Sequence, residues 1–344
     1  MRNYASWNRG LDLDSYLKRE KTVDIYEHAQ NGKLRTWVLA PVDNPQTMDF
    51  FCACETFQRQ ALIHRSTSNG HRRVIAYGIA AVFCPQENRN KGYTTHMMRL
   101  LHYILAPVDT LDTFPTNWGS PPLQPSGLAN ASFSALWSVI GTEFYERLGW
   151  KAKEHVNTIW PCRETTEHLG RVTWLSEDDC EQLWEDDASY VEEKFLDSSR
   201  DESQTTCAFL PNNGLAAFQI RRVKTFLPGS PNLPIPTKWG VKLDDETEPA
   251  YATWITDINY SPASLTITRI RISEKAFPIL LSAAMEAAKE NGCNTVRIWS
   301  LDETLKKIAK TLGGSEEQDL ECVPSLAWYE PEDTNDVKLF FNER

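Results

Sequence analysis

The hydrophobic and polar positions along the chain fall into two blocks in which strand and helix patterns alternate. In the first block, Val74 to Cys84 is a run of apolar and β-branched residues, which predicts a buried central strand with a bulge at Gly78. A polar loop and then a helix follow, and the apolar face of that helix comprises Met97, Leu101, Ile104 and Leu105. Residues 133–137 predict another strand and residues 140–148 another helix, which ends at Gly149.

The second block begins with a helix signal, Ser176 followed three residues later by Asp179. Asn212-Asn213-Gly214 separates two apolar runs and predicts a hairpin turn. Period-2 patterns then predict strands at 251–258, 265–272 and 295–299. Helical patterns predict a helix at about 274–291, between the second and third of these strands, and another at 302–312. This mixture of strands and helices indicates an α/β (α+β) protein.

The length of the chain also favours two units. Globular domains usually span roughly 100–200 residues, and this chain has 344. A polar stretch from Pro161 to Gly170 lies between the two blocks and predicts a linker. We therefore expect one domain at residues 1–160, a linker at 161–170 and a second domain at 171–344.

Composition and charge argue against several classes of protein. The net charge is −11 and no dense Lys/Arg cluster is present, so we expect no nucleic-acid partner. No apolar stretch reaches the roughly 18–20 residues of a membrane span, and Met1 to Ala5 starts no apolar signal core. We therefore expect a cytoplasmic protein without a membrane partner.

Cysteine and histidine positions give no metal or disulfide pattern. The eight cysteines are scattered, which favours reduced, buried thiols. The spacing of the histidines is not that of metal ligands either. We expect no metal site at His64, His71, His96 or His102.

Chemistry is concentrated in the loop that joins the central strand to its helix. Arg89-x-x-Gly92-x-Thr94 places a glycine and a cation where the helix begins. The first turn of a helix leaves backbone N–H groups unpaired, and the helix dipole adds partial positive charge there. Such a turn can bind a pyrophosphate, although the six-residue pattern alone is more typical of a solvated strand–helix turn.

A second segment, Leu136 to Trp150, holds Phe144-Tyr145 shortly before Gly149-Trp150. With the preceding loop, it resembles the two signatures of the GNAT acyl-CoA N-acyltransferases, and the resemblance covers residues 35–160. It implies a mixed, mainly antiparallel sheet flanked by helices. It also implies acetyl-CoA or another acyl-CoA as cosubstrate, a small-molecule amine as acceptor and direct transfer between them without a metal.

The same resemblance assigns the cofactor contacts. The end of the central strand would border the pantetheine arm through main-chain groups, with Phe83 or Cys84 donating to the oxyanion. The implied contacts are Val82, Phe83, Cys84, Arg89, Asn90, Lys91, Gly92, Tyr93, Thr94 and Ser138. On its own chemistry, Ser138 is equally a helix N-cap.

Two residues are candidates for the proton transfers. The resemblance places Tyr145 as the general acid that protonates the leaving thiolate, where a buried phenol would otherwise be a packing residue. Glu55 is the best single candidate for the base that deprotonates the amine, although a carboxylate at a strand edge is usually just solvated.

A narrower resemblance favours a substrate. The chain is similar to the fungal lysine N6-acetyltransferase family, in which a GNAT half precedes a second, divergent half. The segments that carry this resemblance are Trp7 to Glu20, Trp37 to Leu39, Cys54 to Thr56, Val82 to Cys84 and Leu136 to Ser138. They imply L-lysine, acetylated at N6, as the favoured substrate.

Other hypotheses stay open beside this one. Thr94, Trp137 and Val139 depart from the family pattern, which favours an N-acyltransferase of fungal secondary metabolism with another amine or acyl chain. A non-catalytic GNAT-fold binding protein is a further alternative. In the second half, Ile270 to Lys275 has no glycine loop and Glu274 would repel a phosphate, so we expect a degenerate half that does not bind CoA.

Overall fold

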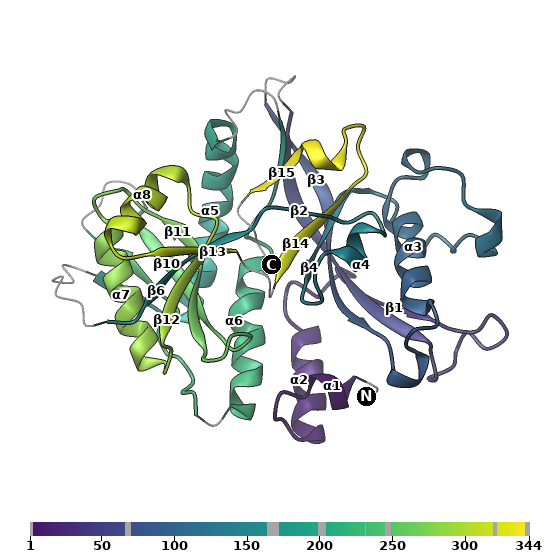
Figure 1. The fold of residues 1–344 in the computed structure, drawn as a ribbon, viewed down its shortest axis with the longest axis horizontal. Coiled ribbons are helices and arrows are strands. Elements are labelled where there is room, and N and C mark those ends of the chain that lie inside the picture. The colour runs from purple at the N-terminus through teal and green to yellow at the C-terminus, as the bar shows by residue number, and fades with distance from the viewer. Residues whose placement is uncertain are drawn as a thin grey trace.

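The computed structural model describes residues 3–65, 70–163, 172–198, 204–230, 232–244, 249–318 and 322–340. These residues form two β-sheets with a pair of helices between them and further helices on the outer faces (Figure 1). The central helices are α5 (Glu177–Ser198) and α6 (Leu215–Phe226). The prediction of mixed, mainly antiparallel sheets flanked by helices is confirmed.

Strands from both ends of the chain make up the first sheet. In spatial order they are β15 (Val337–Phe340), β8 (Thr205–Phe209), β2 (Cys52–His64), β3 (His71–Phe83), β4 (Ala131–Ser138), β14 (Val323–Trp328) and β5 (Lys151–Ala152). β1 (Leu34–Leu39) also pairs with β2. On one side of this sheet lie α1 (Tyr4–Trp7), α2 (Leu13–Asp24) and α6, whereas α3 (Tyr93–Leu105) and α4 (Glu143–Glu146) lie on the other.

The second sheet has a matching set of strands. In spatial order they are β13 (Ser315–Gln318), β6 (Val156–Pro161), β12 (Thr295–Trp299), β11 (Ser264–Arg271), β10 (Tyr251–Asp257), β9 (Gly240–Leu243) and β7 (Val172–Leu175). Its outer face is covered by α7 (Phe277–Glu290) and α8 (Glu303–Thr311). These strands and helices confirm the patterns read in the second block between residues 251 and 312.

Each sheet contains the same unit, an antiparallel strand pair followed by a parallel crossover through a helix. In the first sheet β2 pairs with β3, and β3 returns through α3 to β4. In the second, β10 pairs with β11, and β11 returns through α7 to β12. The second half therefore repeats the topology of the first.

The two units exchange one strand each. β6 follows the first unit in the sequence but pairs with β12 of the second sheet. β14 follows the second unit but pairs with β4 of the first sheet. The short strand β5 then pairs with β14, and β13 pairs with β6, so each sheet is completed by the other half of the chain.

This exchange corrects the expected distribution of strands between 1–160 and 171–344. β8, β14 and β15 come from the second range but belong to the first sheet, and β6 does the reverse. For β6 the reason is that Trp160 is buried in the core under α7, so proximity in sequence did not predict its sheet. Residues 164–170 of the predicted linker lie outside the described residues. A boundary between independently folding units at 161–170 stays a prediction.

Two local expectations are wrong. Asn213 (φ +57°) and Gly214 (φ +78°) join β8 to the helix α6 and do not form a hairpin, because the apolar run after them has helical spacing. The helix expected at 140–148 is confined to Glu143–Glu146, because Gly141 at φ +81° turns the chain just before it.

Helix α5 is tied to both sheets by ion pairs. Its Asp187 accepts a hydrogen bond from Arg271 Nε of β11 at 2.9 Å, and its Glu192 lies 2.9 Å from His71 Nε2 of β3. Asp187 is 5% exposed, so the first of these pairs is largely desolvated. The central layer therefore holds the two sheets in one arrangement.

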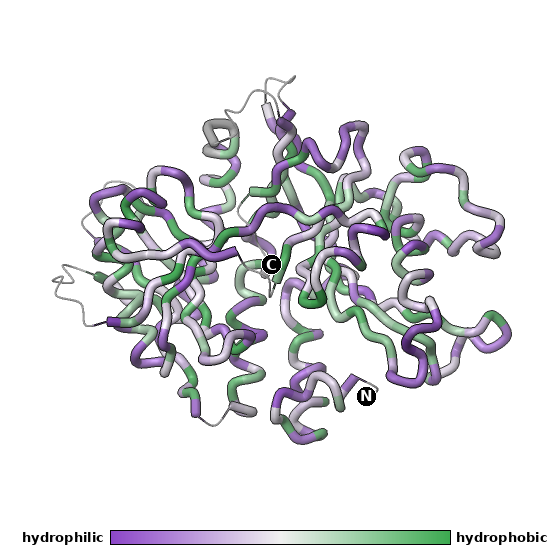
Figure 2. The backbone as a smooth tube through the Cα atoms, in the orientation of Figure 1, coloured by the Kyte–Doolittle hydropathy of each residue, from purple (hydrophilic) through white to green (hydrophobic). Residues whose placement is uncertain are grey.

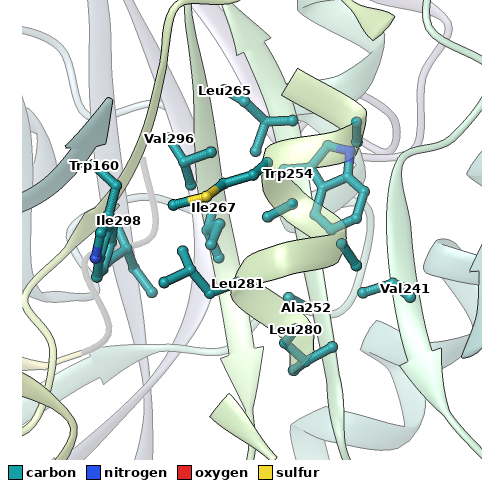
Figure 3. Packing of buried hydrophobic residues seen from close by; sticks show 14 of the residues in the cluster. Trp160, Val241, Ala252, Trp254, Leu265, Ile267, Leu280, Leu281, Val296 and Ile298 are labelled. Carbon is teal, nitrogen blue, oxygen red and sulfur yellow. The ribbon is translucent and has the colours of Figure 1, made fainter. Parts of the chain in front are cut away.

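The core of the second half shows why its sequence folds this way. Trp160, Trp254 and Ile267 pack with the inner face of α7, as Figure 3 shows. In Figure 2 the strands of both sheets carry much of the hydrophobic colouring, whereas the surrounding loops are largely hydrophilic. In the described part of the chain, the helices are too short or too polar to cross a bilayer.

Candidate functional site

A cleft of about 1200 Å³ lies at the first sheet, and it is lined by β2, β3, α1, α2, α4, α6 and the start of α3. It is centred where two neighbouring strands part. The pairing of β3 with β4 runs from Ile75 and Ala131 to Ile79 and Leu136, whereas β3 continues to Phe83. Among the described residues, β3 is therefore not paired with β4 beyond Ile79.

A β-bulge lies in this free end of β3. Phe83 pairs with Ala53 of β2, and Ala80 pairs with Glu55, so two residues of β3 stand opposite Cys54. Ala81 has φ +52°, a left-handed conformation that a bulge can impose. The bulge turns main-chain groups of β3 out of the ladder, and Val82, Phe83 and Cys84 all line the cleft.

The bulge expected at Gly78 is therefore wrong, and the glycine has another role. Gly78 pairs regularly with Phe57. A Cβ atom at Gly78 would lie 2.6 Å from the guanidinium carbon of Arg59. Glycine at this position makes room for the Arg59 side chain, which lies against the strand and lines the cleft.

The loop before α3 has the geometry of an anion site. Gly92, at φ +82°, is the N-cap of α3 and offers no side-chain cap to the N–H groups of the first turn. A Cβ atom at Gly92 would meet only open space. Arg89, Asn90, Gly92, Tyr93 and Thr94 line the cleft, whereas the exposed Lys91 does not.

Three contacts hold this loop against the sheet. Arg89 Nε donates to the carbonyl oxygen of Cys84 at 3.1 Å, and Asn88 Nδ2 donates to that of Phe51 at 3.3 Å. The Phe51 ring stacks on Tyr93 with centroids 4.3 Å apart. The start of α3 is therefore fixed relative to the bulge in β3.

Tyr145 reaches the cleft from α4, on the α3 side of the sheet. It packs in the same core as Cys54 and Ile79, its side chain is 7% exposed, and its residue lines the cleft. Burial, followed by the neighbouring Cys54, raises the pKa of Tyr145 to about 12. Its phenol is therefore protonated throughout the neutral range.

Ser138 lies at the end of β4 but does not line the cleft. Its Oγ donates to the carbonyl oxygen of Gly141 and accepts from Ile140 N at 3.3 Å. This side chain closes the turn after β4, whereas the N-cap of α4 is Thr142. The helix cap expected of Ser138 is therefore wrong, whereas its contact with the cofactor stays a prediction.

Glu55 lies on the opposite face from Tyr145, because successive residues of a strand point to opposite sides of the sheet. It is half-buried and shares the cleft with Glu20 and Asp24 of α2. Burial, followed by repulsion from these two carboxylates, raises the pKa of Glu55 to about 7. Glu55 can therefore accept a proton near neutral pH.

Guanidinium groups line the same face of the cleft. They belong to Arg9, Arg19, Arg59 and Arg222. The sequence analysis identified none of these four and neither Glu20 nor Asp24, because they come from separate segments of the chain and form no motif. Gly78 was the signal available, since a glycine inside a strand marks the close approach of another group.

The second half of the chain forms one wall of the cleft. Phe218, Gln219, Arg222 and Phe226 come from α6, and Ile258, Asn259 and Tyr260 follow β10. Trp7 of α1 packs edge-on against Phe83 with ring centroids 5.3 Å apart. The cleft is therefore enclosed by the N-terminal helices and by the second half together.

The cleft brings together two candidates for proton transfer, Glu55 and Tyr145, and the candidate anion-binding turn before α3. Among the described residues, the structure shows no group of three or more His, Cys, Asp or Glu side chains placed to hold a metal ion. The opening between β3 and β4 connects the face with the α3 turn to the face with Glu55.

Comparison with known proteins supplies the family. The sequence model described as the LYC1 GNAT-like C-terminal domain matches residues 157–344, more than half of the chain. A relative from Yarrowia lipolytica named "Lysine acetyltransferase" is 23% identical over 85% of this chain and 76% of its own length.

Solved structures are more distantly similar. A GCN5-related N-acetyltransferase from Kribbella flavida is 14% identical, covers 95% of this chain and 68% of its own, and has a TM-score of 0.49. Another from Anabaena variabilis is 11% identical over 93% of this chain and 72% of its own, with a TM-score of 0.47. By its family match, the chain belongs to the LYC1-like GNAT proteins and is a GNAT-type N-acetyltransferase.

Proposed function

We propose that this protein transfers an acetyl group from acetyl-CoA directly to the amine of a small molecule, and that L-lysine, acetylated at N6, is its favoured substrate. The observation that carries the proposal is the cleft itself. It joins an anion-binding turn on one face of the sheet to a carboxylate with a pKa of about 7 on the other. The name of the Yarrowia relative favours lysine.

Acetyl-CoA fits the groups present at the α3 turn. The pyrophosphate would lie on the N–H groups of Asn90 to Thr94, with the charge of Arg89 beside it. The open edge of β3 at Val82 to Cys84 would border the pantetheine arm, and an N–H near the bulge would donate to the thioester oxygen. Bound acetyl-CoA supplies the activated acetyl group.

Glu55 would prepare the amine. A lysine ε-amine has a reference pKa of about 10.4, so it arrives as an ammonium and must lose a proton before it can attack. Glu55, Glu20 and Asp24 attract this cation to their part of the cleft. With a pKa of about 7, Glu55 accepts this proton near neutral pH.

Tyr145 would supply the proton that the departing thiolate needs. Its phenol keeps its proton at neutral pH and lies on the face where the acyl-CoA turn is. Its hydroxyl makes no hydrogen bond to another group in the described part of the chain. The phenolic proton is thus free to be given to a group in the cleft.

One observation favours a different amine or acyl chain. Trp137 and Val139, which depart from the family pattern, both line the cleft, and Val139 is 74% exposed there. An apolar side chain at the mouth of the cleft could contact a longer acyl group. This makes an N-acyltransferase with another acyl-CoA or amine the second candidate.

A thiol-release assay distinguishes these functions. The purified chain is incubated with acetyl-CoA or a longer acyl-CoA and with L-lysine, other amino acids or polyamines. We expect the highest kcat/KM for acetyl-CoA with L-lysine, and a product that carries the acetyl group at N6 by mass spectrometry. Higher activity with another pair would establish the second candidate. CoA binding without thiol release would indicate a binding protein.

A further inference from the structure

Two neighbouring arginines of α6 lie in opposite environments. Arg221 is paired with carboxylates of α5, with its Nη2 2.6 Å from Glu181 and its Nε 3.4 Å from Glu177. Arg222 instead lines the cleft. Within the described residues, its guanidinium makes no ion pair or hydrogen bond with another side chain. The cleft therefore receives a guanidinium whose charge no direct partner balances.

Arg9 lies beside Arg222 in the same wall. Both line a small recess together with Asp257 and Asn259 at the end of β10. Arg9 donates to Asn259 Oδ1 at 2.6 Å, which holds its side chain on the second half of the chain. Asp257 Oδ1 accepts from the backbone N of Asn259 at 3.0 Å and from its amide at 2.8 Å. The negative charge of Asp257 acts on both Arg9 and Arg222, so one carboxylate is shared between two guanidinium groups.

The backbone at Arg9 is held in an unusual conformation. Its φ of +47° is left-handed, a conformation that is unfavourable for a residue with a side chain. The segment is fixed by close backbone packing, since a Cβ atom at Gly10 would lie 2.4 Å from the carbonyl oxygen of Gly229. The fold thus maintains a strained turn that presents Arg9 at the cleft.

Charge is unevenly distributed within this face of the cleft. Glu55, Glu20 and Asp24 lie toward β2 and α2, where Arg19 pairs with Glu20 and Arg59 also lines the cleft. Arg222 and Arg9 lie toward α6 and the end of β10. Burial, followed by the positive charge of Arg9, lowers the pKa of Arg222 to about 10, although the nearby Asp257 opposes this shift. Both groups stay charged at neutral pH, and an anion bound between them would relieve their mutual repulsion.

We propose that Arg222 and Arg9 bind the carboxylate of the acceptor, so that the cleft selects amines that also carry a carboxylate, as amino acids do. The proposal rests on the proposed function, because it assigns the far end of the same substrate. A guanidinium matches the geometry of a carboxylate and binds it through charge-assisted hydrogen bonds. Glu55, Glu20 and Asp24 then lie at the other end of the substrate, beside the amine that is acetylated.

The phosphates of CoA are a less suitable partner for these arginines. The turn before α3 lies on one face of the first sheet, and α6 lies on the other. An anion at Arg222 therefore belongs to the molecule that enters from the α6 face. This is the face of Glu55, where the acceptor amine would be deprotonated.

Two matched substrates test the assignment. L-lysine and 1,5-diaminopentane share the same amine and carbon chain, and only lysine has a carboxylate. For Arg222→Gln we expect KM for L-lysine to rise about 10-fold to 100-fold, as the loss of a charged hydrogen-bonding partner implies. KM for acetyl-CoA and kcat/KM for 1,5-diaminopentane should change less than about threefold. Arg221→Gln is the matched control and should leave all three unchanged.

A binding measurement separates this inference from the proposed function. L-norleucine has the carboxylate and carbon chain of lysine but lacks its ε-amine, so it is not an acceptor at N6. Calorimetry should show it binding to the wild type and to Arg221→Gln, and at least about tenfold more weakly to Arg222→Gln. The difference in norleucine binding is expected even if no amine is acetylated. In that case the proposed function is wrong, but the carboxylate site is not.

Several outcomes would overturn the inference. One is an equal loss of activity with lysine and with diaminopentane. Another is an increase in KM for acetyl-CoA alone, which would assign Arg222 to the phosphates. A third is unchanged norleucine binding. If Arg222→Gln does not fold, as judged by its thermal melt, the same kinetic and binding measurements are made on Arg9→Gln. The same results are expected, because Arg9 belongs to the same proposed carboxylate site.

Discussion

Glu55 and Tyr145 line one cleft from opposite faces of the same sheet. Glu55 lies on the α2 and α6 side, whereas Tyr145 packs with Cys54, the residue before Glu55, under α3. The sheet is open between them because the pairing of β3 with β4 ends at Ile79 and Leu136. The proposed proton acceptor and the proposed proton donor thus stand on the two sides of one opening, where a direct transfer between two bound substrates would need them.

The first prediction concerns Tyr145→Phe. If the phenol protonates the leaving thiolate, kcat should fall about 10²-fold to 10⁴-fold, the usual range for a general acid. The ring and its packing are kept, and the hydroxyl has no hydrogen-bond partner in the described part of the chain, so stability should hardly change. Steady-state kinetics and a denaturant melt measure both. A kcat within about threefold of wild type would remove Tyr145 from the mechanism.

The second prediction is the pH dependence of Glu55. Because its pKa is raised to about 7, kcat should decrease as the pH falls below 7 and Glu55 becomes protonated. Glu55→Gln should lower kcat about 10²-fold or more and should abolish this acidic limb. A pH profile of the variant that keeps the wild-type limb would show that another group is titrating.

The third prediction follows from the same shift and concerns stability. Glu55 has a pKa of about 7 in the folded chain against an ordinary value of 4.5, so the folded chain binds more protons between these values. The free energy of unfolding should therefore decrease as the pH rises from 4.5 to 7. Glu55→Gln should be more stable than wild type at pH 8, and equally stable below pH 4.5. Urea melts at the two pH values measure the difference, and a destabilised variant at pH 8 would contradict it.

The fourth prediction tests the turn before α3. Gly92→Asp places a negative charge where the pyrophosphate would lie and should weaken CoA binding roughly tenfold or more. Gly119→Asp is a fair control, because Gly119 has a similar φ of +88° and its Cβ atom would also meet open space. Calorimetry should show a loss of affinity only in the first variant. If the two variants bound CoA with equal affinity, CoA would not bind at this turn.

The fifth prediction concerns the exchanged strand β14. Leu326 is fully buried in the first sheet, so Leu326→Ala should cost about 2–5 kcal/mol of unfolding free energy. Leu123, which is 92% exposed, gives a control for the same substitution, with an expected change within about 0.5 kcal/mol. A loss below about 1 kcal/mol at Leu326 would mean that β14 contributes little to this sheet.

The sequence predicted those parts of the fold in which neighbours in the chain are also neighbours in space. The strand at 74–84, the helix after it and the five elements between residues 251 and 312 follow from local period and from residues that end helices. The turn before α3 was predicted for the same reason, because Gly92 and the helix start are contiguous.

The remainder depends on contacts that local patterns do not encode. A buried strand such as β6 has the same apolar pattern in either sheet, so its partner was not predictable. The position of the bulge at Ala81 is set by the register with β2, and alanine gives no signal for it. The arginines of the cleft lie more than 200 positions apart at Arg9 and Arg222, and only the packing of α6 beside the N-terminal helices brings them together.

The strand exchange also fixes the order in which the molecule can be completed as it is synthesised. β2, β3 and β4 leave the ribosome early, but the place beside β4 stays empty until residues 323–328 have emerged. In the meantime β6 has no partner, because β12 has not yet been made. A nascent chain therefore exposes two unpaired strand edges, which are the features that attract other strands and chaperones. The sheet that carries Glu55 is thus completed by residues that are made after the whole of the second unit.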